Sequence, residues 1–152
     1  MLAVALSAGG LCQWQPAPLR HPHGELIQTV ETITSRSILD HDLEPLVAAL
    51  PQHLVNTADE RRRIEARAEA GLDELRRRLG PVADWEVAEV LTDEAGRVKV
   101  RVRFYRDRAG TAAKRPYRGV SFIFQSVGRR PSLVWVGFWD PETGSWDVIG
   151  DS

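Results

Sequence analysis

Two halves of the chain differ in the spacing of their hydrophobic positions. Between residues 24 and 79 the apolar residues recur every three or four positions, which is the spacing of an amphipathic helix. Between residues 85 and 149 they alternate with polar residues, as in strands that bury one face. Helices followed by a run of strands favour an α+β domain over an alternating α/β fold.

The first half predicts three helices, of which two lie before residue 51. The first covers residues 24–39, where one face is apolar. The second is a short helix within residues 40–50. Asp40 or Asp42 can cap its N-terminus, and Pro51 ends it. Both acids are therefore interpreted as caps rather than catalytic groups.

The third helix, residues 57–79, has the clearest boundaries. The stretch TADE is a capping box, in which Thr57 and Glu60 satisfy each other's backbone amides. Gly80 and Pro81 end the helix. A narrow apolar stripe faces the core, and Arg and Glu fill the remaining positions. The arginine run near its end is thus interpreted as a solvated helix face.

The second half predicts an antiparallel meander. In the strand RVKVRVRFYR, valines alternate with basic residues, so we expect one face to be buried and the other to be exposed to solvent. A register that places Val87 opposite Val102 also places Leu91 opposite Val98, which keeps apolar residues together. Three further strands follow. We expect an α+β domain over residues 24–152, with N-terminal helices packed on a curved, cone-like antiparallel sheet of about five strands.

The helical stretch ITSRSILDHDLEPLVAALPQHL and the closing W-D-V-I resemble the nuclear-transport-factor-2-like superfamily, which also contains ketosteroid isomerase. The resemblance covers about Gly24 to Ile149. It implies a cone-shaped fold with a pocket between helices and sheet, and dimerisation through the sheets. Ketosteroid-isomerase-like enzymes hold an acid or base in that pocket. Here the inward strand positions carry no carboxylate, so catalysis is disfavoured.

The N-terminus, residues 1–23, is an apolar arm or the remnant of an export signal. Its first twelve residues are small and apolar but lack the basic start of a signal peptide. Cys12 is a candidate for lipidation. The alternative is a strand or arm that packs on the core, with Cys12 as a small buried residue. The cell envelope and the cytoplasm both stay open as locations.

Charge is balanced over the whole chain but not along it. The net charge is −1, yet eleven Lys or Arg residues and one acid lie between Arg97 and Arg130. One interpretation is a site for an anionic partner such as an acidic protein or lipid head groups. The alternative is pairing of these residues with nearby acids. Nucleic acid is disfavoured, because aromatic and basic residues are not interleaved. The candidate residues are Arg97, Lys99, Arg101, Arg103 and Arg118.

The stretch SLVWVGFWDPETGSW is apolar on both faces of its strand. The turn DPETGS places Trp139 opposite Trp146, which predicts a stabilising aromatic pair. Trp135 is expected in the core opposite Phe124. The other face would be covered by the N-terminal arm, a protein partner or a second subunit. This candidate apolar interface consists of Ile123, Val134, Val136 and Phe138.

Motifs for catalysis, metals and cofactors are weak. His21 and His23 have the spacing of two metal ligands on a strand, but a third ligand is missing, so a polar linker is favoured. No phosphate-binding loop, dinucleotide fingerprint or nucleophile elbow occurs. We expect no catalytic residue, metal or cofactor. The leading hypothesis is a non-enzymatic binding or assembly domain that uses its sheet face. The alternative is an enzyme or ligand binder that uses the cone pocket.

Overall fold

The structure is a computed structural model that describes residues 14–19, 22–106, 116–141 and 146–147. Its helical elements are α1 (Gly24–Thr32), the π-helix η1 (Ile33–Leu39), α2 (Glu44–Ala49), the 3₁₀ turn η2 (Gln52–Leu54) and α3 (Ala58–Leu79). Its strands are β1 (Gln15–Ala17), β2 (Asp84–Thr92), β3 (Val98–Tyr105), β4 (Arg118–Val127), β5 (Arg130–Trp139) and β6 (Trp146–Asp147). The predicted α+β class is confirmed.

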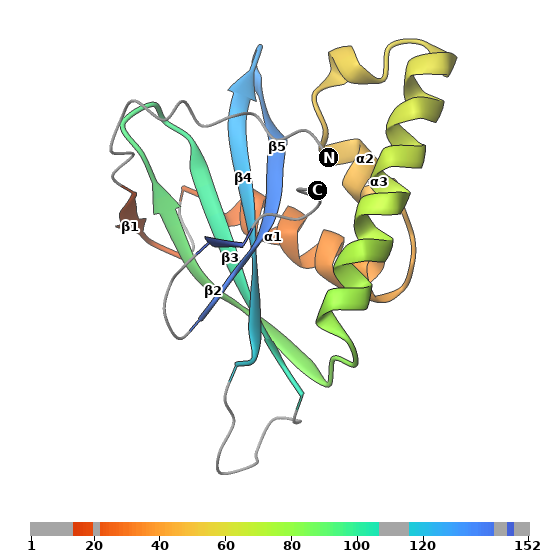
Figure 1. Ribbon diagram of the computed structural model, residues 1–152. Coiled ribbons are helices and arrows are strands. Elements are labelled where there is room, and N and C mark those ends of the chain that lie inside the picture. The colour runs from red at the N-terminus through yellow and green to blue at the C-terminus, as the bar shows by residue number, and fades with distance from the viewer. Residues whose placement is uncertain (1–13, 20–21, 107–115, 142–145, 148–152) are drawn as a thin grey trace.

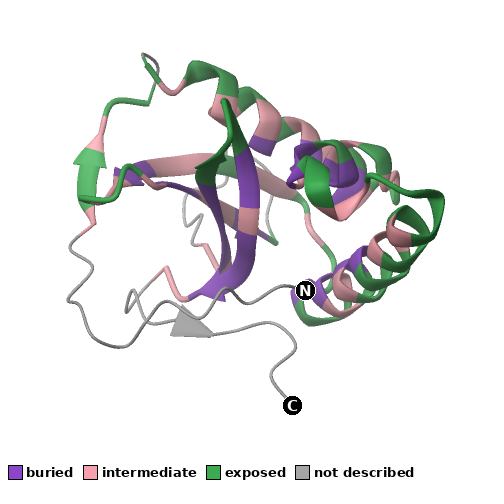
Figure 2. Cartoon of the chain, turned by 90° about the horizontal axis from the view of Figure 1, so that it is seen from above, coloured by how far each residue is buried: buried purple, intermediate pink, exposed green. Residues whose placement is uncertain are grey.

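The helices lie together on one side of the sheet (Figure 1). Seen from above, the buried residues lie along the strands and on the helix faces turned toward them (Figure 2). One core joins the two layers and includes Val30 of α1, Leu75 of α3, Val100 of β3 and Phe122 of β4. None of the described helices is both long and apolar enough to cross a bilayer.

The helix boundaries follow from local chemistry. At the start of α3, the Thr57 hydroxyl accepts from the Glu60 amide at 3.1 Å, and the Glu60 carboxylate accepts from the Thr57 amide at 3.4 Å. The predicted capping box is therefore confirmed. The first predicted helix is continuous but changes from α to π geometry at Ile33. Arg76 of α3 donates to the Ser37 carbonyl at 3.2 Å and so ties this π-helix to α3.

The strands of the antiparallel sheet lie in sequence order from β1 to β6. β1 falls within the predicted N-terminal arm and pairs with β2. The predicted pair Val87 and Val102 is confirmed, but the prediction for Leu91 is wrong. A bulge at Ala88 shifts the register, so Val98 lies opposite Thr92. One extra residue moves the following side chains to the other face.

The side of the sheet away from the helices carries a layer of tryptophan and basic side chains. Trp135 is buried as predicted, but it lies opposite Ile123 instead of Phe124 and does not belong to the core beneath the helices. A Cβ built on Gly137 would come 2.0 Å from the Trp135 ring, and one on Gly119 would come 2.2 Å from the Trp139 ring. Each tryptophan therefore lies directly over a glycine of the sheet.

Candidate functional site

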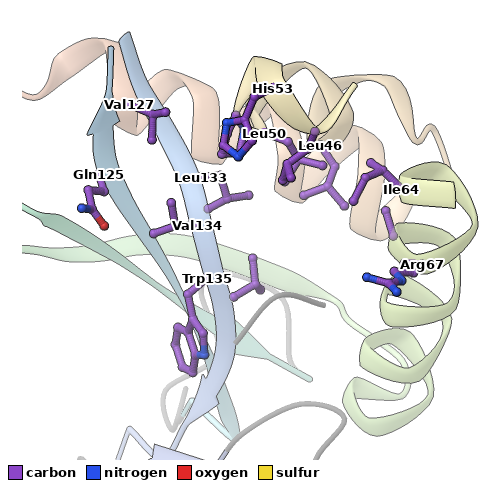
Figure 3. A pocket seen from close by; sticks show the side chains of 14 residues that line it. Leu46, Leu50, His53, Ile64, Arg67, Gln125, Val127, Leu133, Val134 and Trp135 are labelled. Carbon is purple, nitrogen blue, oxygen red and sulfur yellow. The ribbon is translucent and has the colours of Figure 1, made fainter. Parts of the chain in front are cut away.

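A pocket opens between the helices and the edge of β5 (Figure 3). Its volume is about 270 Å³, just below the ~300–1,000 Å³ range of sites for drug-sized ligands, which suits a smaller molecule. One wall comes from α2, η2 and α3, and the other comes from β4 and β5. The pocket is therefore built from segments that are far apart in the sequence.

The helix wall is opened by the way α2 ends. Leu50 leaves the helix with extended backbone angles, φ −73° and ψ 158°, and Pro51 follows it. The chain then turns through η2 instead of continuing along the sheet. Across from it, α3 presents Ile64 and the small Ala68 to the pocket. The larger Leu72, one turn further along, fills the core instead.

The strand wall is shaped by a second bulge. Val134 is the extra residue of β5, between the paired positions Leu133 and Trp135. Leu133 points toward the helices and Trp135 points away from them, so the pocket follows the edge of the strand (Figure 3). Within the described residues, β6 pairs only with Phe138 and Trp139. The first part of β5 is thereby left as the border of the pocket.

The lining of the pocket is mostly aliphatic. Its polar side chains are His53 of η2, Arg67 of α3 and Gln125 of β4, and all three are exposed. No Asp or Glu is among the described residues that line it. A carboxylate base in an apolar pocket, which the superfamily resemblance implies for its enzymes, has no counterpart at this site. The arrangement can hold an apolar group and offers hydrogen-bond donors at its rim.

Asp42 lies outside this pocket, just before the N-cap residue of α2. Its carboxylate accepts from the Glu44 amide at 3.1 Å and pairs with Arg36. The Glu44 amide, and next the Arg36 guanidinium, hold the pKa of Asp42 below its usual value of 3.8. The N-cap position itself is Leu43, so Asp42 satisfies the first amide of α2 from the residue before the cap, whereas Asp40 is exposed just beyond η1.

Two of the five residues predicted to bind an anionic partner are ion-paired with acids of the preceding segment. Arg97 lies 2.6 Å from Asp93, and Arg101 lies 2.7 Å from Glu89. Local pairing, the alternative raised from the sequence, is therefore present for these two. The Arg101 guanidinium also lies 4.6 Å from the centroid of the Trp139 ring.

The other three predicted basic residues do not extend this group into an open patch. Lys99 is 1% exposed, with its ammonium 4.2 Å from the centroid of the Trp14 ring. Arg103 is half-buried on the same side of the sheet. Arg118 lies opposite Phe104 in the register and over the Phe138 ring, which places it on the helix side. The five residues are thus divided between the two faces.

The four residues predicted as an apolar interface do not share a face either. Val136 and Phe138 belong to the core beneath the helices. Ile123 lies on the opposite side and pairs with Lys99 across the strands. Val134 is in the bulge and borders the pocket. The expectation of one common face was wrong, because alternation within each strand does not indicate how two strands pair: Ile123 lies opposite Trp135, and the bulge takes Val134 out of the alternation.

The remaining predictions concern the ends of the chain and metals. Trp139 and Trp146 are opposite each other in the backbone register, as expected. The side chain of Trp146, Cys12 and His21 lie outside the described residues. Across the part of the chain that is described, no three His, Cys, Asp or Glu side chains gather as a metal site.

The pocket and its polar residues were not predicted from the sequence. His53, Arg67 and Gln125 belong to no motif. One signal was present at Arg67: the positions three and four residues away on α3 are Arg63, Ile64, Ala70 and Gly71, so no acid can pair with it along the helix.

Comparison of the chain with protein-family models, with curated proteins and with solved structures found no match.

Proposed function

We propose that this chain is a non-enzymatic binding domain that holds a small apolar molecule in the pocket between α2, α3 and β5. The observation that carries the proposal is the cavity of about 270 Å³, whose lining, among the residues that the structure describes, is mostly aliphatic and contains no carboxylate. Apolar pockets with a few polar groups at the rim are the usual form of small-molecule sites. A position between helices and sheet also agrees with the resemblance to the nuclear-transport-factor-2-like superfamily.

The sheet face away from the helices supports binding less well. Ser121, Ile123 and Lys99 on that face are 0%, 1% and 1% exposed in the single chain. A partner would find little free apolar surface there. Assembly through the sheet, with a protein partner, a second copy or a membrane surface, stays a prediction from the sequence.

The test is titration with 1-naphthylamine, a small neutral apolar dye whose fluorescence shifts to shorter wavelength in an apolar site. We expect saturable binding to the wild-type chain. Ala68→Trp should abolish it, because Ala68 is 4% exposed and borders the cavity that the indole would fill. Ala70→Trp is the matched control, since Ala70 is exposed on the same helix and does not line the pocket.

Loss of folding must be separated from loss of the cavity. Val134→Trp fills the pocket from the strand wall at a half-buried position, and far-ultraviolet circular dichroism reports folding for each variant. Dye binding that persists in folded Ala68→Trp and Val134→Trp chains would contradict the proposal, as would the absence of saturable binding to the wild type.

A further inference from the structure

We propose that the ligand of this pocket is a small monocarboxylate, with an apolar tail inside the cavity and its carboxylate at Arg67. The inference rests on the proposed function and narrows it to one chemical class. The observation behind it is a charged side chain at the rim, Arg67, for which the described residues provide no ion pair.

Arg67 differs from most arginines of α3. Five others each pair with a carboxylate three or four residues away on the helix; these are Arg61, Arg62, Arg76, Arg77 and Arg78. Among the described residues, no ion pair or hydrogen bond is found for Arg67. Its side chain extends from α3 toward β5 and lines the pocket (Figure 3). Within the part of the chain that the structure describes, the guanidinium therefore faces an apolar cavity with no acidic side chain paired to it.

The cavity and the charge together specify the ligand. A guanidinium binds a carboxylate through two parallel hydrogen bonds, which fixes the position of the head group. A single arginine balances one negative charge, and the described residues that line the pocket include no second Lys or Arg. His53 and Gln125 supply further donors at the rim. A ligand with one carboxylate thus matches the polar part of the site.

The size of the cavity limits the tail. At ~30 Å³ for a group of the size of a water molecule, 270 Å³ holds roughly nine such groups. An unbranched chain of about eight carbons, or a single aromatic ring on a short linker, has this size. Leu50, Ile64 and Leu133 would contact the tail from both walls.

The experiment compares octanoate with 1-octanol, which has the same tail without the charge, by isothermal titration calorimetry. We expect the wild type to bind octanoate about tenfold more tightly than octanol, since a charge-assisted pair is stronger than a neutral one. High salt should weaken octanoate binding and leave octanol binding unchanged.

Arg67→Gln removes the charge and retains donors. This variant should lose about tenfold in octanoate affinity, with octanol affinity unchanged. Arg63→Gln is the matched control, because Arg63 is exposed one turn earlier on α3 and does not line the pocket. It should bind both molecules as the wild type does. The selective loss at Arg67 is a result that a merely structural role would not give.

The possible outcomes separate the two proposals. If octanol and the neutral dye bind but octanoate shows no preference for the wild type over Arg67→Gln, the monocarboxylate is overturned and the apolar pocket stands. If none of the three molecules binds, both proposals fail. An N-acetylated dipeptide ending in leucine that binds more tightly than octanoate would also overturn the small-molecule ligand, in favour of a peptide C-terminus.

Discussion

Lys99 is as deeply buried as the residues of the hydrophobic core. It is 1% exposed in the middle of β3, between Leu91 and Ile123 of the neighbouring strands. Its ammonium lies 4.2 Å from the centroid of the Trp14 ring. A cation held over an aromatic face recovers part of the cost of leaving water. Trp14, just before β1, thus stabilises a charge inside the protein.

We predict that Trp14→Leu lowers the free energy of unfolding by about 1–2 kcal/mol, because the desolvated cation loses its aromatic face. Trp14→Phe should lose less, since it keeps a ring. Urea unfolding measures both. A double-mutant cycle with Lys99→Met isolates the pair from the packing of Trp14. A coupling energy of zero between the two positions would contradict this account.

Asp42 makes stability depend on acid pH. Its pKa is lowered by the Glu44 amide and by Arg36, so the carboxylate is favoured in the folded state. The stabilisation it provides is complete above the pKa of the unfolded chain. It is lost as the pH falls through the folded-state pKa, which lies below 3.8.

We therefore expect Asp42→Asn to be less stable than the wild type near neutral pH, with a difference that shrinks as the pH falls through the acid range. Chemical unfolding at a series of pH values measures this difference. Arg36→Gln keeps the contact with the Glu44 amide and should retain part of the pH dependence. A constant difference between wild type and Asp42→Asn at all pH values is the result that would refute the assignment.

At the scale of the elements, two tryptophan rings of β5 pack directly on the backbone of glycine residues in the sheet. Trp135 lies over Gly137 within β5, and Trp139 lies over Gly119 of β4. A ring that covers a bare stretch of backbone excludes water from it. The bulky residues of this face thus depend on the small ones beside them.

We predict that Gly137→Ala destabilises the chain by about 1–3 kcal/mol, because the new methyl group would overlap the Trp135 ring. Gly24→Ala is the matched control: a Cβ there meets no atom within 4 Å, so stability should change little. Thermal unfolding followed by circular dichroism compares the two variants. Equal stability of Gly137→Ala and the wild type would contradict the close packing of ring and backbone.

Elements whose ends are determined locally were predictable from the sequence. The capping box at Thr57 and the apolar stripe of α3 each depend on residues within a few turns. The two bulges were not predictable, because nothing in the local alternation marks Ala88 or Val134 as an extra residue. The face of β5 that meets the helices was also open, since both of its faces are apolar.

The whole molecule determines the candidate site. The end of α2, the first turns of α3 and the bulge in β5 meet only after the helices dock on the sheet. No pattern within one segment indicates the space that remains between them. The sequence could indicate that Arg67 makes no ion pair along its own helix, because no acid lies three or four residues away from it. The sequence could not indicate that Arg67 lies beside a cavity.

The short strand β1 affects how this molecule assembles. β3, β4 and β5 each pair with the strand before them in the chain, so these contacts are local and can form early. The pairing of Ala17 with Val90 instead closes a loop that contains all three helices. Closing so long a loop costs entropy, and three residues return little of it. β1 is therefore expected to join the sheet last and to detach from it first, exposing the edge of β2 while the rest of the core stays folded.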